Sequence, residues 1–88
     1  MMRQESAQIL ALRALAWGAE GEALPRFLTA SGLDPEDLKA RAHEPELLAA
    51  WLDFLLLDDG LAGAFCAQEN IQPADLHRAR AALPGSSR

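Results

Sequence analysis

The sequence predicts an all-α fold, a compact bundle of five or six short helices. Half of the 88 residues are hydrophobic, and the aliphatic ones are nearly all Leu and Ala, with no Val and only two Ile. Leu and Ala favour helices, whereas the missing β-branched residues favour strands. Five residues also recur 38 positions later, which predicts two similar helix-corner-helix units: Phe27, Leu33, Pro35, Asp37 and Leu38 return as Phe65, Ile71, Pro73, Asp75 and Leu76.

Residues 1–84 are expected to form one helical domain, because a chain of this length and hydrophobic content can bury a core without disulfides or metals. Residues 85–88 are predicted to be a flexible C-terminal tail. A single cysteine, Cys66, cannot form an intramolecular disulfide, which fits a reducing compartment. Glu5 and Arg13 flank and interrupt the one apolar N-terminal stretch, so we expect neither a signal peptide nor a membrane span, and a cytoplasmic protein.

The first helix is predicted from about Ser6 to Trp17. It carries two apolar stripes, Ile9 with Leu12 and Ala16, and Leu10 with Ala14 and Trp17. Apolar residues therefore surround much of its circumference, which predicts that this helix is heavily buried. Gly18 and Gly21 are expected to end the helical pattern.

A short second helix should follow, with Leu24, Phe27 and Leu28 on one face and Pro25 in the first turn. The corner after it carries the strongest local signal. Gly32 suits a left-handed residue at the end of the helix, Asp34 suits the N-cap of the next helix, and Pro35 suits its first position. Leu33 and Leu38 are spaced to form a hydrophobic staple across this corner.

The second copy repeats these roles. Asn70 replaces Gly32, and Asn is the other residue that tolerates the left-handed conformation. Gln72 takes the N-cap position as a weaker cap than Asp34, ahead of Pro73. A helix-corner-helix is therefore predicted in both halves of the chain.

Between the two corners, a central helix is predicted from Glu44-Pro45 to about Asp58. Eight large apolar residues leave it few solvent-facing positions, for which Asp53 and Ala49/Ala50 are the candidates: Leu47, Leu48, Trp51, Leu52, Phe54, Leu55, Leu56 and Leu57. Asp58 is then expected to cap a short helix that buries Leu61, Ala62, Phe65 and Cys66. The final helix, about Pro73 to Leu83, should face inward through Leu76, Ala79 and Leu83 and end at Pro84-Gly85.

The corners also have the spacing of a helix-turn-helix motif, as Leu28, Gly32, Leu33 and Leu38 illustrate. The first candidate recognition helix opens with Asp34, Glu36 and Asp37, which would repel phosphates. The second carries His77, Arg78 and Arg80, a small cationic surface in a chain of net charge −5. We therefore favour a structural corner and regard nucleic acid as a disfavoured partner.

We predict no catalytic residue, no cofactor site and no metal site. His43, Cys66 and His77 lack the close paired spacing of a zinc site, and we expect His77 at the surface and Cys66 in the core. Asp53, Asp58 and Asp59 lack the alternating oxygen ligands of a calcium loop, and a helix cap explains them. The chain has neither a nucleophile elbow nor a glycine-rich phosphate loop, so we do not expect an enzyme.

Three segments resemble a family of small bacterial proteins catalogued as domain of unknown function 3572, chiefly alphaproteobacterial. They are residues 27–38, residues 52–58 and the ending Arg78-Ala79-Arg80-Ala81-Ala82-Leu83-Pro84-Gly85. The resemblance covers nearly the whole chain, but its matching positions are mostly helix caps and core residues. It implies a small helical cytoplasmic protein, and it carries no catalytic residue, ligand or partner.

The excess of apolar residues on the central helix favours a non-enzymatic protein-protein interaction module. Trp17, Trp51, Leu56 or Leu57 would form the patch, for a homodimer or for the helix of a partner protein. The alternative is a DNA-binding or transcription-accessory protein that uses the corner bearing His77, Arg78 and Arg80. A small-molecule pocket between the two units is a third option, for which the sequence offers no polar constellation.

Overall fold

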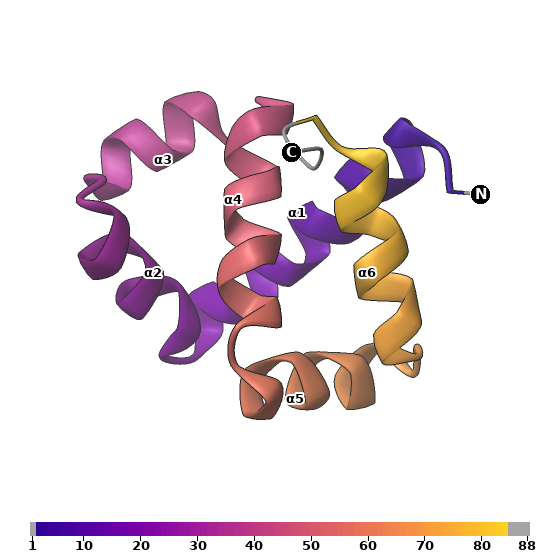
Figure 1. The fold of residues 1–88 in the computed structure, drawn as a ribbon. Coiled ribbons are helices and arrows are strands. Elements are labelled where there is room, and N and C mark those ends of the chain that lie inside the picture. Colours follow the sequence, from indigo (N-terminus) through magenta and orange to yellow (C-terminus); the bar gives the residue numbers. More distant parts are fainter. Residues whose placement is uncertain (1, 85–88) are drawn as a thin grey trace.

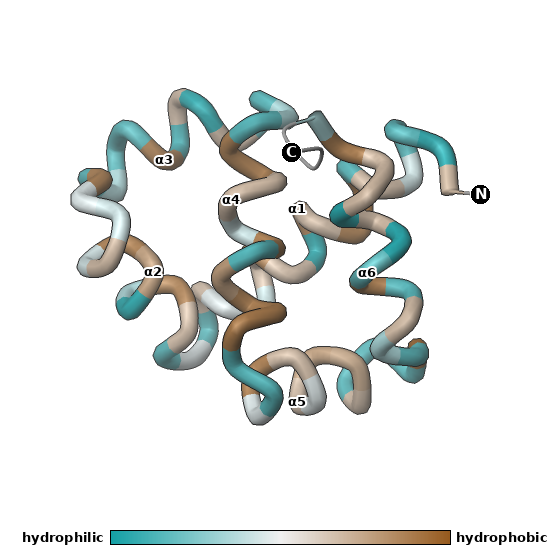
Figure 2. Tube along the Cα trace, in the orientation of Figure 1, coloured by the Kyte–Doolittle hydropathy of each residue, from teal (hydrophilic) through white to brown (hydrophobic). Residues whose placement is uncertain are grey.

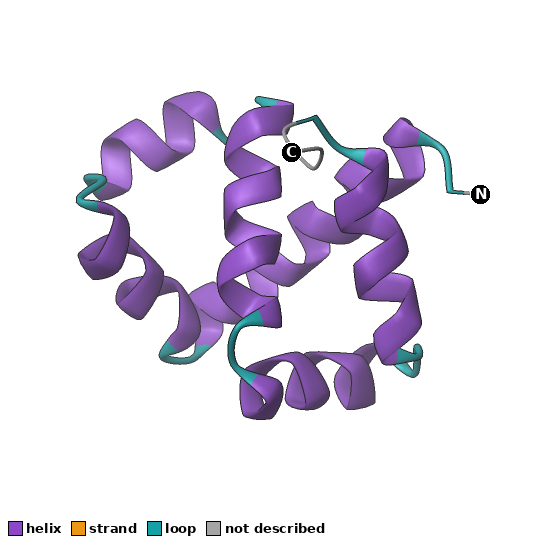
Figure 3. Cartoon of the chain, in the orientation of Figure 1, coloured by secondary structure: helices purple, strands orange, loops and turns teal. Residues whose placement is uncertain are grey.

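The computed structural model describes residues 2–84, and six α-helices make up most of this part of the chain (Figure 1). The helices are α1 (Gln4–Glu20), α2 (Ala23–Ser31), α3 (Pro35–Arg41), α4 (Pro45–Leu56), α5 (Asp59–Glu69) and α6 (Pro73–Ala82). Between residues 2 and 84 the chain forms no strand, so the predicted all-α fold is confirmed (Figure 3). The tail predicted at residues 85–88, and Gly85 as a stop for the last helix, lie outside the described residues.

Helix α4 stands at the centre of the bundle and packs against α1, α2, α5 and α6 (Figure 1). Its fully buried side chains are Leu48, Trp51, Leu52 and Leu55. Along the trace, hydrophobic residues recur through α4, whereas hydrophilic residues dominate α3 (Figure 2). The prediction that Ala49 faces solvent is wrong, because Ala49 is buried, while Ala50 and Asp53 are exposed as expected. The helix ends at Leu56 rather than at Asp58.

The prediction that large apolar residues of the first helix are buried is wrong for one stripe. Ile9 is 57% exposed and Leu12 is 41% exposed, and Ala16 is exposed beside them. The buried face of α1 instead consists of small residues with one leucine: Ala7, Ala11, Ala14, Leu15 and Gly18. Small side chains allow two helix backbones to approach closely, so this face can pack tightly against α4 and α6.

Gly18 does not end α1, as the sequence suggested, but lies buried inside it, and the helix continues to Glu20. The six-membered ring of Trp51 occupies the space that a side chain at residue 18 would need. Gly21 follows the helix as its C-cap, and its N–H donates to the carbonyl oxygen of Gly18. At 17 residues α1 is the longest of the six helices, and no helix within residues 2–84 is both long and apolar enough to cross a membrane.

In both corners a left-handed residue is followed two positions later by an extended N-cap residue, and a proline comes directly after that. Gly32 has φ of 79° and Asn70 has φ of 57°, which confirms the roles predicted for them. Proline opens the next helix in each case, at Pro35 and Pro73. Leu38 is buried and Leu33 is half-buried against the core, as a staple requires.

The caps of the two corners differ from the expected ranking. Asp34 occupies the N-cap position of α3, but its side chain makes no capping hydrogen bond there. At the second corner the N–H of Gln72 donates to Oδ2 of Asp75 at 3.0 Å, so the third residue of α6 reaches back to the residue before the helix. The corner that we expected to be weaker therefore has the better satisfied helix start.

The remaining helices follow the predictions closely. The side chain of Asp58 caps α5 by accepting a hydrogen bond from the N–H of Leu61 at 3.1 Å. Phe65 and Cys66 are buried on the inner face of α5, with Leu61 half-buried at its start. Helix α6 faces inward through Leu76, Ala79 and the following Leu83, all of which are buried.

Candidate functional site

The four residues predicted to form an apolar surface patch differ widely in exposure. Trp51 is completely buried, so its assignment to the patch is wrong. Trp17 and Leu56 are half-buried and pack against the core. Leu57, the residue that follows the last turn of α4, is 87% exposed. Leu57 is therefore the one predicted patch residue that presents most of its side chain to solvent.

Trp51 is buried because three aromatic rings form a cluster between α2 and α4. Its ring meets that of Phe27 edge-on at a centroid distance of 5.3 Å and stacks with that of Phe54 at 6.1 Å. Phe27 and Phe54 complete the cluster at 5.4 Å. The Trp51 Nε1 atom is buried and finds no hydrogen-bond partner among the described residues. Trp51 thus supports the surface above it without reaching that surface.

That surface is a shallow groove of about 250 Å³ between α2 and α4, which we call the α2–α4 groove. Its lining residues are Phe27, Ala30, Ser31, Ala50, Asp53, Phe54 and Leu57. On α4 and the residue that follows it they occur at residues 50, 53, 54 and 57, the spacing of one helix face, and on α2 at residues 27, 30 and 31. Phe27 and Phe54 form the aromatic part of the lining, while exposed Ala30 and Ala50 leave room above the backbone. The groove is thus mostly apolar and open.

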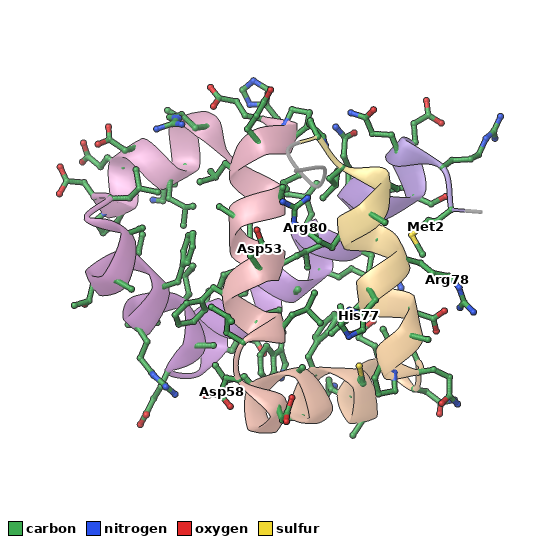
Figure 4. All side chains as sticks on the ribbon, in the orientation of Figure 1. Met2, Asp53, Asp58, His77, Arg78 and Arg80 are labelled. Carbon is green, nitrogen blue, oxygen red and sulfur yellow. The ribbon has the colours of Figure 1, made fainter. Side chains whose placement is uncertain are left out.

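An ion pair limits the charge at the edge of the groove. Oδ1 of Asp53 accepts a hydrogen bond from Nε of Arg80 at 2.6 Å, linking α4 to α6 (Figure 4). The Arg80 side chain is only 14% exposed, and its Nη1 atom also donates to the carbonyl oxygen of Pro84 at 3.3 Å. Asp58, the residue after Leu57, pairs with Arg26 of α2 at 3.4 Å. Carboxylates near the groove are therefore partly neutralised by cations of this same chain.

The cationic corner proposed for DNA reading is neutralised in the same way. Arg78 contacts Oδ1 of Asp75 at 2.8 Å, and Arg80 contacts Asp53 as described. His77 is exposed on α6, as expected. The first corner exposes Asp34, Glu36 and Asp37. Neither corner presents a cluster of cations of the kind that DNA-binding surfaces use.

Of the candidate metal ligands and nucleophiles, Cys66 and Asp58 occupy structural positions, whereas His43 and His77 are exposed. No group of three or more His, Cys, Asp or Glu side chains within residues 2–84 is arranged to hold a metal ion. Cys66 is buried in the core, and this burial, together with the negative charge of Asp75, raises the pKa of its thiol. A thiol that holds its proton more tightly is a poorer nucleophile. Asp58 caps α5, and its neighbour Asp59 is exposed in the first turn of that helix.

A second pocket, of about 380 Å³, lies where the end of α1 and the start of α2 meet α5. Its lining includes Trp17, Glu20, Glu22, Arg26 and Gln68. Trp17 packs against Phe65 at a centroid distance of 5.6 Å, so its ring is anchored in the core at the base of this region. Both signs of charge line the pocket. It is the place in the fold that corresponds best to the small-molecule pocket considered from the sequence.

Sequence reasoning found Leu57 but missed the residues that surround it. Phe27 and Phe54 were assigned to helix faces without a common site, and Ala30 received no role. A signal was present in α4, because Ala50, Phe54 and Leu57 are spaced along one face of a helix whose opposite face already holds Leu48, Leu52 and Leu55. What the sequence could not supply was that α2 would lie beside this face.

Comparison with known proteins gave one match. A family model described as "Protein of unknown function (DUF3572)" matches residues 4–86. No curated protein and no solved structure matches the chain.

Proposed function

The chain belongs to the DUF3572 family, whose description names no activity, and from this premise we propose that it is a non-enzymatic protein-interaction module. The partner is a protein that inserts an apolar helix face into the α2–α4 groove. The proposal depends above all on the exposure of Leu57, which has 87% of its surface in solvent at the edge of an apolar groove.

The position of Leu57 supports this proposal energetically. Burying a leucine side chain contributes about 1.5–3 kcal/mol, and a partner that covers Leu57 would gain most of this free energy. Phe54 is half-buried in the same groove, and its exposed part would be covered in the same step. A handful of such apolar anchors dominates the affinity of many helix-in-groove complexes.

The shape of the groove favours a helix as the occupant. Ala30 on α2 and Ala50 on α4 are small and exposed, so a third helix can approach the backbone of both. Its apolar residues at i, i+3, i+4 and i+7 would meet Phe54 and Leu57, which Phe27 supports from the core. The aromatic cluster below gives this surface a packed support, which reduces the free energy spent on ordering it during binding.

A photo-crosslinking experiment tests the proposal. A photoreactive amino acid is placed at position 57 in cells of the native host, and the crosslinked proteins are identified together with the site of attachment. We expect attachment within an apolar face of a helix in another protein. Affinity capture with the wild-type chain and with Leu57→Glu is the second arm, in which the same protein should be retained only by the wild type.

The matched control is Ala64→Glu, which adds the same charge at an exposed position on α5. It should retain the partner, and both variants should keep the wild-type melting temperature because neither side chain is buried. Retention of the crosslinked protein by Leu57→Glu would contradict the proposal. So would crosslinks from position 57 that reach only nucleic acid, or only a second copy of this chain.

A further inference from the structure

The outer face of α1 carries an apolar stripe that the fold leaves uncovered. Ile9, Leu12 and Ala16 lie at i, i+3 and i+7 on the side of the helix opposite the buried Ala7, Ala11 and Gly18. Ile9 and Leu12 are two of the three large hydrophobic residues with strong exposure among residues 2–84, and Leu57 at the α2–α4 groove is the third. The stripe is therefore a second apolar surface, on a different helix from the groove.

Residues of opposite charge lie on the two sides of Ile9, in an order that would let the stripes of two copies pair with each other. Glu5 lies four residues before Ile9 and Arg13 lies four residues after it, so the three share one side of the helix. All three side chains are exposed. If two α1 helices pack antiparallel about a twofold axis near Ile9, Glu5 of each copy faces Arg13 of the other. A parallel pair would place Glu5 against Glu5 and Arg13 against Arg13, which is repulsive.

From this arrangement we infer that the outer face of α1 is an interface for a second copy of this chain, packed antiparallel around Ile9. Every contact between two different residues then occurs twice, as a twofold interface requires. Ile9 of one copy contacts Ile9 and Leu12 of the other, while Ala16 lies beyond the point where α1 of the other copy begins. Two Glu5–Arg13 pairs fix the antiparallel direction.

The existing contact of Arg13 is compatible with this interface. Its Nη1 atom lies 3.5 Å from Oε1 of Glu69, and 65% of its side chain remains exposed. A guanidinium group has five N–H donors, so it can contact Glu69 of its own chain and Glu5 of the second copy together. Because one helix from each copy makes the contact, the interface is smaller than the standard size and the dimer is expected to be weak and concentration-dependent.

Sedimentation equilibrium of the full chain, up to about 1 mM, measures this association. The wild type should show a monomer-dimer equilibrium, and Ile9→Lys should be monomeric over the same range. Glu5→Arg and Arg13→Glu should each weaken self-association by about tenfold, because each turns two attractive pairs into two repulsive ones. The double variant with both changes should recover wild-type association, because the cation and the carboxylate of each pair have then exchanged places.

An equimolar mixture of Glu5→Arg and Arg13→Glu gives the most discriminating measurement. One chain then carries two cations and the other two carboxylates at these positions, so the mixed dimer should form in preference to either homodimer. Arg13→Glu also removes the contact between Arg13 and Glu69 of the same chain. Glu69→Gln removes the charge of that partner alone, and it should associate as the wild type does. Circular dichroism confirms that each variant is folded.

A wild-type chain that stays monomeric at all concentrations would overturn the inference. Dimerisation that survives Ile9→Lys, or a double variant that stays as weak as the single ones, would also overturn it. Leu57→Glu should dimerise normally, because its side chain belongs to the α2–α4 groove. This last result separates the α1 interface from the function proposed above, so that either can fail alone.

Discussion

Gly18 in α1 lies directly against the indole ring of Trp51 in α4. A Cβ atom built at Gly18 would come within 2.7 Å of Cη2 and 3.0 Å of Cζ2 of this ring, and within 3.3 Å of the backbone nitrogen of Leu24. Since Trp51 is completely buried and stacked on Phe54, its ring cannot move aside without disturbing the aromatic cluster. Helices α1 and α4 can therefore pack this closely only because residue 18 has no side chain.

Gly18→Ala is expected to destabilise the protein by about 1–3 kcal/mol, because overpacking at this contact outweighs the better helix propensity of Ala. Gly63→Ala is the matched control, since Gly63 is also a helical glycine but has nothing within 4 Å of its Cβ position. That control should stabilise the protein by about 0.5–1 kcal/mol. Urea unfolding of both variants checks the pair, and two changes of the same sign would contradict the interpretation.

Trp51→Phe provides a second check on the same contact. Phe lacks the ring atoms that meet residue 18, so Gly18→Ala should cost less in this background than in the wild type, although Trp51→Phe alone is destabilising. The double-mutant cycle is measured by the same urea unfolding. Additive effects would mean that the two residues do not interact.

The left-handed residue at each corner predicts a ranking of substitutions. Gly32 has open space around its Cβ position, so the effect of a replacement there comes from its backbone φ of 79°. Gly32→Val should cost about 1–2 kcal/mol or more, and Gly32→Asn clearly less, because Asn tolerates this region. Asn70→Gly should be close to neutral and Asn70→Val destabilising. Melting temperatures give the ranking, and equal values for the Val and Asn variants at position 32 would refute it.

Leu38→Ala should destabilise the protein by about 2–4 kcal/mol, because Leu38 is the buried member of the first staple. Leu33→Ala should cost less, since Leu33 is only half-buried. Chemical denaturation of the two variants measures the difference. An unchanged stability in Leu38→Ala would show that α3 is not held to the core through this residue.

The buried thiol of Cys66 predicts a loss of stability at alkaline pH. Its pKa is raised in the folded protein by burial and by the charge of Asp75, so the unfolded chain releases this proton at a lower pH than the folded chain does. The contribution of this thiol to the free energy of unfolding is then fully present below the ordinary pKa of a cysteine, and it declines as the pH rises above that value. Cys66→Ala should remove this decline from the pH profile of unfolding. A wild-type profile that matches that of Cys66→Ala would contradict the prediction.

Local signals predicted much of this fold. Gly32, Asn70, Pro35, Pro73 and Asp58 occupy the positions expected of them, because helix ends depend on the conformational preferences of a few adjacent residues. The burial of Leu76, Ala79 and Leu83 also followed from their spacing.

The faces of α1 and the surroundings of Leu57 could not be predicted in this way. Hydrophobicity selects Ile9 and Leu12 over Ala7 and Ala11, whereas close packing of α1 against its neighbours selects the small residues. Trp51 and Leu57 are both apolar residues of one segment, and only the positions of α1 and α2 decide that the first is covered and the second is not. The family membership expected from residues 27–38, 52–58 and 78–85 agrees with the family model that spans residues 4–86.

The packing of α1 against α6 has a consequence for synthesis in the cell. Of the six helices α1 leaves the ribosome first, but α6, which covers part of its small-residue face, is translated after the other five. Until α6 emerges, Ala7 and Ala11 lack their final surroundings, so the native packing of α1 is completed only after α6 has left the ribosome. A nascent chain stopped after α5 should therefore remain sensitive to protease, and extending it through Leu83 should bring protection.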